Sequence, residues 1–217
     1  MLAGGADLFR QLAADRGSTT NPGYSMQDYR PALFLDRDGV VNREVGYLHR
    51  PDQVEFTPGI FQLCRGAQAL GYALIIITNQ SGIARQLYSE TDFHVLMEWM
   101  TKEFVQQQVN VDGYYFCPHH PEFGVGPYRK ECEDRKPQPG MILKAATDHR
   151  IDLKRSILIG DRCSDLQAGA AAGISKLILV RGTELHECPA TPPHFAVSDL
   201  PEIIPFLTST TTPANAY

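Results

Sequence analysis

Two aspartates, Asp36 and Asp38, stand where the apolar run 32–35 gives way to Gly39. In an extended strand, residues two apart project to the same side, so both carboxylates can converge on one point beyond the strand. A closely spaced carboxylate pair is costly to bury unless a cation or a shared proton neutralises it. Clustered carboxylate oxygens suit Mg²⁺, so the pattern favours a site for a divalent cation and a phosphate. The same pattern also occurs in ordinary acidic turns.

A second group of polar residues follows the apolar run 74–77, which is typical of a buried parallel strand. Residues 78–82, TNQSG, supply a hydroxyl, amides and a glycine turn. These groups can donate hydrogen bonds to phosphate oxygens. Because Thr78 could equally cap a helix, this segment alone leaves both interpretations open.

Cations and further acids come from the second half of the chain. Arg135 and Lys136 precede the sequence PQPG, and the apolar run 157–159 leads to Asp161 and Asp165. Taken singly, this lysine could be solvated and these acids could belong to a turn. Together, the segments predict one site in which two strand ends supply acids, one supplies a hydroxyl and a lysine lies between them.

Alternating strands and helices are predicted to position these groups. We expect strands at 32–35, 73–78, 112–116, 156–160 and 176–180, and helices at about 58–70, 89–109, 139–149 and 164–172. This alternation predicts an α/β fold of three Rossmann-like layers, with a central parallel sheet between helices. Ligands of such sheets bind beyond the carboxyl ends of the strands, which is where the polar motifs lie.

One domain is expected at 31–182, between two extensions of different character. Residues 1–30 contain a polar, loop-forming stretch and read as an N-terminal arm. Residues 183–217 are rich in proline and threonine and form a C-terminal extension that packs on the domain or trails from it. Apart from a short helix near 199–207, we expect this extension to be loosely held.

Composition limits the class of protein. The chain has 217 residues, is 43% hydrophobic and 21% charged, and can bury one core of ordinary size. Its formal charge is −5 and its lysines and arginines are scattered, so the sequence predicts no basic patch that would bind nucleic acid. No apolar run approaches the roughly 18 residues of a membrane span, and the start does not read as a secretory signal. We therefore expect a cytoplasmic enzyme without membrane or nucleic-acid partners, and a monomer.

In order and spacing, the four segments resemble the haloacid dehalogenase superfamily of phosphotransferases over about residues 30–182. The sequences DRDGVVN at 36–42, TNQSGIAR at 78–85, CPHHP at 117–121 and RKPQPGM at 135–141 look like those of D-glycero-D-manno-heptose-1,7-bisphosphate 7-phosphatases. This resemblance implies a phosphatase acting on a small phosphorylated sugar in the synthesis of ADP-heptose for the lipopolysaccharide core. Histidinol-phosphate phosphatases share most of these features, so histidinol phosphate or a broad range of small sugar phosphates are the alternative substrates.

Members of this superfamily often carry a cap domain over the substrate. Here the stretches from Asp38 to Thr78 and from Thr78 to Lys136 are filled by the expected strands, helices and loops. We therefore expect a capless enzyme with an open site, rimmed by the loops 42–50, 79–86 and 117–134. The lack of a cap also argues against a phosphomutase, which must retain its phosphorylated intermediate.

Charge and geometry suggest the catalytic roles. Asp36 is the expected nucleophile, because an ionised carboxylate needs no deprotonation before it attacks phosphorus to form an aspartyl-phosphate. Asp38 is the expected acid for the leaving oxygen and then the base for water. Mg²⁺ would be held by Asp36, the backbone carbonyl of Asp38 and Asp161, with Asp165 behind them.

Phosphate and sugar contacts are expected from several loops. Thr78 and Lys136 would bind the non-bridging phosphoryl oxygens. The resemblance implies that the residues near the sugar are Asn42, Glu44, Gly46, Tyr47, Asn79, Gln80, Ser81 and Arg85. Arg135 and Arg162 are candidates for a remote anionic group, because a guanidinium can grip a second phosphate. Histidinol offers an ammonium there, so the two arginines favour the bisphosphate.

A second metal site is suggested by two pairs of residues with the layout of a structural zinc loop: Cys117, His119, Cys132 and Asp134. Relatives place a cysteine where Asp134 stands, so the chain departs from the usual three thiolates and one imidazole. Asp can bind zinc through one oxygen, and Glu131, Glu133 and His120 are nearby substitutes. Because fewer thiolates weaken such a site, a loop folded without metal is the alternative.

Overall fold

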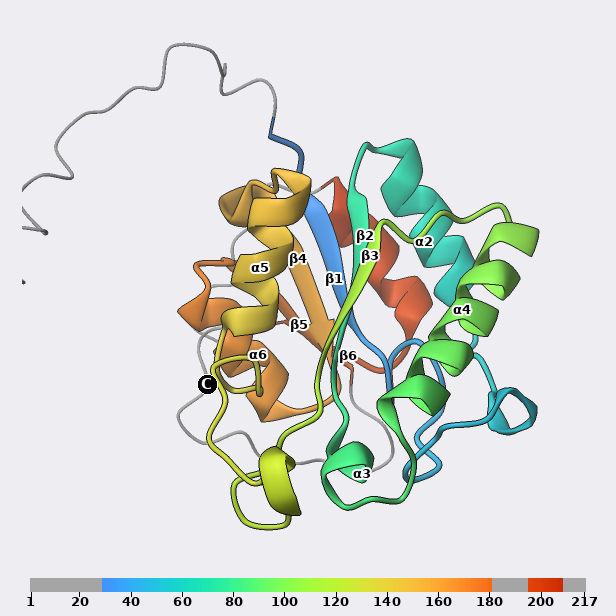
Figure 1. Cartoon of the computed structure of the whole chain (residues 1–217). Coiled ribbons are helices and arrows are strands. Elements are labelled where there is room, and N and C mark those ends of the chain that lie inside the picture. The colour runs from blue at the N-terminus through green and yellow to red at the C-terminus, as the bar shows by residue number, and fades with distance from the viewer. Residues whose placement is uncertain (1–28, 181–194, 209–217) are drawn as a thin grey trace, which may run out of the picture.

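The centre of the fold is one six-stranded parallel sheet with the order β3-β2-β1-β4-β5-β6 (Figure 1). The structure is a computed structural model that describes residues 29–180 and 195–208. The expected N-terminal arm lies almost wholly outside these residues. The strands are β1 (Ala32–Asp36), β2 (Ala73–Asn79), β3 (Gly113–Cys117), β4 (Ile157–Gly160), β5 (Lys176–Val180) and β6 (Phe195–Val197).

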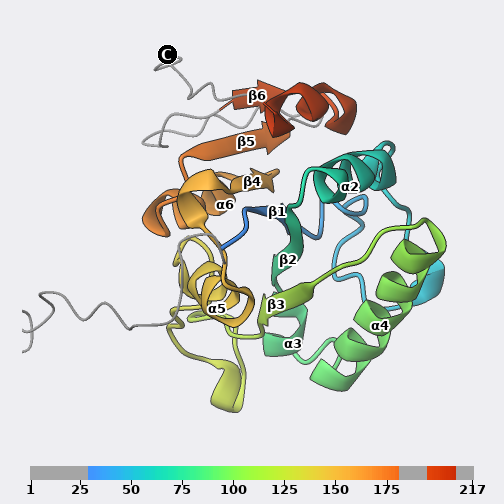
Figure 2. The same cartoon turned by 90° about the horizontal axis from the view of Figure 1, so that it is seen from above.

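Helices cover both faces of the sheet and complete the predicted three layers (Figure 2). On one face lie α2 (Ile60–Ala69) and α4 (Glu90–Gln106), and on the other α5 (Gly140–His149) and α6 (Cys163–Ala171). The remaining helical segments are α3 (Ser81–Ala84), η2 (Pro51–Gln53), η3 (Gly126–Tyr128), η4 (Leu153–Arg155) and η5 (Leu200–Leu207). The predicted α/β fold is confirmed, and the described residues include no cap domain. None of the described helices combines the length and apolar character needed to cross a bilayer.

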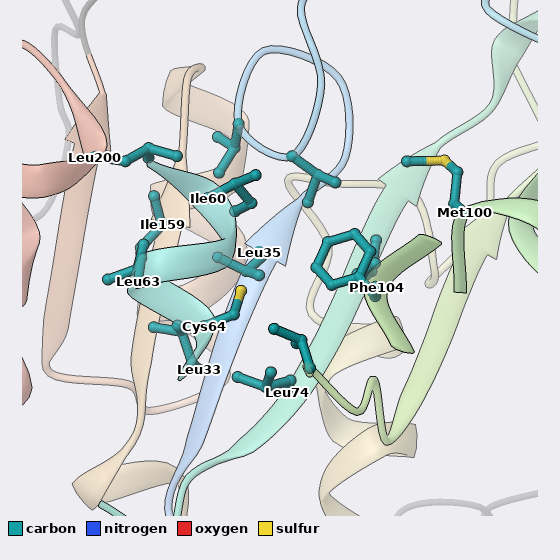
Figure 3. Packing of buried hydrophobic residues seen from close by; sticks show 14 of the residues in the cluster. Leu33, Leu35, Ile60, Leu63, Cys64, Leu74, Met100, Phe104, Ile159 and Leu200 are labelled. Atoms are coloured by element: carbon teal, nitrogen blue, oxygen red, sulfur yellow. The ribbon is translucent and has the colours of Figure 1, made fainter. Parts of the chain in front are cut away.

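A tight apolar core fixes the central strands. Leu33 and Leu35 of β1 point toward Ile60 and Leu63 of α2 (Figure 3), and all four side chains are buried. Strand β1 is buried along its whole length because helices cover both of its faces. Each such aliphatic side chain contributes about 1.5–3 kcal/mol on burial, so the carboxyl end of β1 is held rigidly.

The C-terminal residues 195–208 pack on the domain, with η5 where a short helix near 199–207 was expected and with strand β6, which was not predicted. Strand β6 pairs in parallel with β5, and η5 packs on α2 through the buried Leu200 and Ile203. Gly59 allows this close approach, because a Cβ there would lie 2.9 Å from Pro201. A strand of three residues in a proline-rich context carries too little periodicity to be read from sequence. The predicted domain boundaries stay a prediction.

Candidate active site

The ends of three neighbouring strands bring the predicted polar groups to one edge of the sheet. Asp36 is the last residue of β1 and lies in register with Ile77 of β2, so Thr78 follows directly beside it. Asp161 comes immediately after β4, which is the other neighbour of β1. Parallel strands thus place an acid, a hydroxyl and a second acid at the same edge, as predicted.

A cavity of about 550 Å³ opens at this edge. Its lining residues are Asp36, Asp38, Glu44, Gly46, Tyr47, Thr78, Asn79, Gln80, Ser81, Gly82, Arg135, Lys136, Arg162, Ser164 and Asp165. Nearly all of the predicted catalytic and substrate residues therefore meet in one place. Two predicted sugar contacts, Asn42 and Arg85, are not among the lining residues, and Asn42 is fully buried behind them. Ser164, at the start of α6, was not predicted.

Three carboxylates crowd together beneath the cavity. Asp36, Asp161 and Asp165 each place a carboxylate oxygen within 4.8 Å of the others. Burial and the neighbouring Asp165 raise the pKa of Asp161 to about 6. The same two causes raise the pKa of Asp36 well above its ordinary value. Oδ1 of Asp161 is also buried without a hydrogen-bond partner in the described part of the chain. Both observations fit a site for a hard divalent cation, which would relieve the repulsion and satisfy the free oxygen.

Lys136 supplies a buried positive charge to this cluster. Its Nζ lies 2.8 Å from Oδ1 of Asp36 and 2.6 Å from Oδ1 of Asp165. Burial alone would lower the pKa of Lys136, but the two carboxylates more than offset this, so its pKa is raised and the ammonium stays charged. Asp165, predicted to lie behind the metal ligands, is thus an ion-pair partner of Lys136 as well as a member of the cluster.

Asn79 lines the cavity and also has a structural role that was not predicted. Its side-chain amide donates to the backbone carbonyl of Lys136 at 3.0 Å, and its Oδ1 accepts from the backbone N–H of Lys136 at 3.0 Å. This pair of hydrogen bonds ties the end of β2 to the loop that carries Lys136. The lysine is therefore positioned through its backbone as well as through its charged partners.

Asp38 is held by donors that come from three directions. Arg37, which is 1% exposed, donates from Nη2 to both oxygens of Asp38 at 3.0 and 2.9 Å. The amides of Asn42 and Gln80 donate to the same carboxylate at 3.1 and 3.2 Å. Arg37 also contacts the ring of Phe93, 5.6 Å from its centroid. Sequence reasoning missed Arg37, although its position between the two aspartates was a signal.

Arginines lie at the mouth and wall of the cavity. Arg162 forms an ion pair of 3.0 Å with Glu44, and both side chains are substantially exposed. Arg135 donates from Nη1 to the backbone carbonyl of His119 at 3.1 Å. Both guanidiniums line the cavity as predicted. Arg85 is displaced from it and stacks on Phe123, with its Cζ 4.1 Å from the ring centroid.

A second cluster with metal-ligating groups adjoins the site. Cys117, His119 and Cys132 place ligand atoms within 4.8 Å of one another. Burial raises the pKa of Cys117 to about 12, so a metal would have to displace its proton. The structure does not bring Asp134 into this group, because its Oδ2 pairs with Lys144 at 2.5 Å. Two thiolates and one imidazole still form a donor set that suits zinc.

Known proteins match this chain over most of its length. A family model described as "HAD-hyrolase-like" matches residues 134–203. The D-glycero-alpha-D-manno-heptose-1,7-bisphosphate 7-phosphatase of Burkholderia mallei is 46% identical over 186 residues, which cover 86% of this chain and 98% of that protein. The chain belongs to the heptose-bisphosphate phosphatase family. This membership confirms the predicted haloacid dehalogenase resemblance.

Two further members of the heptose-bisphosphate phosphatase family support the match. The D-glycero-beta-D-manno-heptose-1,7-bisphosphate 7-phosphatase of Vibrio cholerae is 44% identical over 179 residues, covering 81% of this chain and 96% of that protein. The crystal structure of D,D-heptose 1.7-bisphosphate phosphatase from B. bronchiseptica, complexed with magnesium and phosphate, has a TM-score of 0.69 and 29% identity. The matched region covers 82% of the present chain and 97% of the B. bronchiseptica chain.

Proposed function

We propose that this chain is a Mg²⁺-dependent phosphatase that removes the 7-phosphate of D-glycero-D-manno-heptose 1,7-bisphosphate. The observation that carries the proposal is the cluster of Asp36, Asp161 and Asp165 at the edge of a cavity, with the buried Lys136 paired to Asp36 and Asp165. The chain that holds it is 46% identical to a phosphatase of this substrate. A neutral or apolar site at this edge would have argued for a binding protein. The acids, the ammonium and the cavity instead suit transfer of a phosphoryl group.

Asp36 and Asp38 divide the chemistry between them. The carboxylate of Asp36 attacks phosphorus, an O–P bond forms, and the bond from phosphorus to the sugar oxygen breaks. Asp38 gives its proton to that oxygen as it leaves. Asp38 then takes a proton from water, which attacks the aspartyl-phosphate and releases inorganic phosphate with Asp36 restored.

Other residues hold the phosphoryl group and its counter-charge. The hydroxyl of Thr78 and the ammonium of Lys136, which both line the cavity, would bind non-bridging oxygens. Mg²⁺ would be held by Asp36, Asp161 and the backbone carbonyl of Asp38, and when bound it supplies positive charge that favours the ionised carboxylates. Asp165 keeps Lys136 oriented.

The remote phosphate is assigned to the arginines at the cavity. Arg135 and Arg162 both line it. Arg135 donates to a backbone carbonyl, and Arg162 pairs with the exposed Glu44 at 3.0 Å and lies 4.0 Å from Asp161. A second phosphate can therefore replace Glu44 as the partner of Arg162. This charge pattern supports a bisphosphate over histidinol phosphate, whose ammonium would prefer acids.

A zinc ion bound by Cys117, His119 and Cys132 is a further part of the proposal. These residues tie the end of β3 to the loop before Lys136. Zinc would thus brace the segment that presents the lysine. Monomeric state and cytoplasmic location stay predictions.

Phosphate release from candidate substrates tests the function. Both anomers of the heptose 1,7-bisphosphate, histidinol phosphate and p-nitrophenyl phosphate would be compared under the same Mg²⁺ concentration. We expect kcat/KM for one or both heptose anomers to exceed that for histidinol phosphate at least about tenfold, which is about 1.4 kcal/mol. A preference for histidinol phosphate would reject the proposed substrate.

A further inference from the structure

Gln80 makes three side-chain hydrogen bonds in a buried position. It is 2% exposed. Its Oε1 accepts from the hydroxyl of Tyr88 at 2.5 Å. Its Nε2 donates to Oγ1 of Thr78 at 2.8 Å and to Oδ2 of Asp38 at 3.2 Å. One amide therefore joins two groups of the catalytic machinery to a tyrosine outside it.

The chemistry of the partners fixes the orientation of this amide. In its carboxylate form, the form that takes the proton from water, Asp38 accepts hydrogen bonds and donates none, so it must face the NH₂ group of Gln80. The amide oxygen then faces Tyr88, whose hydroxyl must donate. A flipped amide would place its oxygen against the carboxylate, which is repulsive. Each hydrogen bond in the chain thus determines the direction of the next.

The side chain of Tyr88 is fixed by burial and by close packing against its neighbours. Its side chain is 8% exposed, and its ring stacks on His49 with centroids 5.1 Å apart. Burial raises the pKa of Tyr88 to about 12, so its hydroxyl keeps its proton near neutral pH. Gly82 permits the close packing, because a Cβ at that position would lie 2.2 Å from the tyrosine ring.

We infer that Tyr88 and Gln80 are positioning residues that set the hydrogen-bond roles of Thr78 and Asp38. Because Oγ1 of Thr78 accepts from Gln80, its own proton is free to point toward a phosphoryl oxygen. Because Nε2 of Gln80 also contacts Asp38, the acid and the hydroxyl keep a fixed spacing. This inference rests on the proposed phosphatase function and replaces the expected contact of Gln80 with the sugar.

The Tyr88→Phe variant removes the donor and keeps the ring. We expect kcat to fall about tenfold and KM to stay within about twofold, because substrate does not touch the tyrosine. The matched control is Tyr72→Phe, which loses a 3.0 Å hydrogen bond to the carbonyl of Leu207 at the opposite end of β2. The control should keep wild-type kcat. Wild-type kcat in Tyr88→Phe would overturn the inference.

Gln80→Ala separates positioning from sugar binding. Loss of positioning lowers kcat with p-nitrophenyl phosphate and with the heptose bisphosphate by a similar factor, since the same chemistry is affected. A sugar contact would instead raise KM for the bisphosphate and leave p-nitrophenyl phosphate unchanged, which would overturn the inference. If the wild type hydrolyses p-nitrophenyl phosphate and rejects the heptose bisphosphate, the proposed substrate fails, while the kcat of Gln80→Ala with p-nitrophenyl phosphate still tests the positioning role: a wild-type kcat would overturn it.

A spectroscopic measurement tests the hydrogen-bond chain without turnover. Side-chain amide protons of Gln80, observed by ¹⁵N NMR in the Mg²⁺-loaded protein, should exchange with water at least about tenfold faster in Tyr88→Phe than in wild type or Tyr72→Phe. Equal exchange in all three proteins would show that Tyr88 does not hold the amide, and would overturn the inference.

Discussion

The Nζ atom of Lys136 lies 2.8 Å from Oδ1 of Asp36, and both side chains are almost fully buried. A buried charge that loses its partner typically costs about 3–5 kcal/mol. This ion pair therefore links stability of the strand end to the charge needed for phosphoryl transfer.

Lys136→Met should lower the free energy of unfolding by about 3–5 kcal/mol in Mg²⁺-free buffer, because Asp36 and Asp165 lose their ammonium partner. Saturating Mg²⁺ should restore part of the loss, since a bound cation offsets the same carboxylates. Urea unfolding with and without Mg²⁺ measures both effects. Lys102→Met, on the exposed surface of α4, is the control and should change stability by less than about 0.5 kcal/mol. Equal stability of the two variants would contradict the buried ion pair.

Stability of the Mg²⁺-free protein should depend on the protonation of Asp161. Its pKa is raised from 3.8 to about 6, so the folded state binds this proton more tightly than the unfolded state. The contribution of Asp161 to stability is therefore lost as pH rises from about 4 to about 6. Asp161→Asn should stabilise the Mg²⁺-free protein by up to about 3 kcal/mol at pH 7 and by about half as much at pH 5. Chemical unfolding at the two pH values provides the measurement, and a pH-independent effect would argue against the raised pKa.

Much of the fold was readable because apolar runs and strand ends leave strong signals. The buried run 74–77 and the acids after residues 35 and 160 predicted parallel strands and the edge where the groups meet. Strand β6 was missed because three residues carry no clear alternation. The predicted rim segment 79–86 contains the short helix α3, which hydrophobic periodicity cannot reveal over four residues.

The sequence predicted which residues meet at the site better than it predicted the contact that each one makes. Asn79 and Gln80 were predicted to lie near the sugar, and both line the cavity. The hydrogen bonds of their amides to Lys136 and Asp38 were not predicted. Amide hydrogen bonds depend on which backbone and side-chain groups the fold brings alongside, and spacing in the chain does not report this. Tyr88 is eight residues beyond Gln80 and becomes its partner only through the turn that contains Gly82.

The zinc content of variants tests which residues near Cys117 and Cys132 bind the metal. The purified protein should carry about one zinc per chain, and Cys132→Ser should lose it because the cluster then keeps only one thiolate. Asp134→Asn should retain zinc, since this carboxylate pairs with Lys144 in the structure. Cys64→Ala, on the buried face of α2, serves as the control and should also retain zinc. If active wild-type protein contains only a few hundredths of an equivalent of zinc, the proposed zinc site is wrong.

The proposed role of Arg162 in binding the distal phosphate can be tested by a change in KM. Arg162→Ala should raise KM for the heptose bisphosphate about 10-fold or more, because a charge-assisted hydrogen bond contributes about 1.5–3 kcal/mol. It should leave KM for p-nitrophenyl phosphate nearly unchanged, since that molecule has no second phosphate. Arg43→Ala, which removes an exposed ion pair with Glu55, is the matched control. Steady-state kinetics that show equal effects on both substrates would contradict a distal-phosphate role.

The most direct test of the central claim is the rate of phosphate release by Asp36→Asn, compared with wild type at saturating Mg²⁺ and heptose bisphosphate. The amide cannot form the aspartyl-phosphate, so we expect at least about a 10⁴-fold lower rate with the fold retained. A rate near that of wild type would contradict phosphoryl transfer through Asp36.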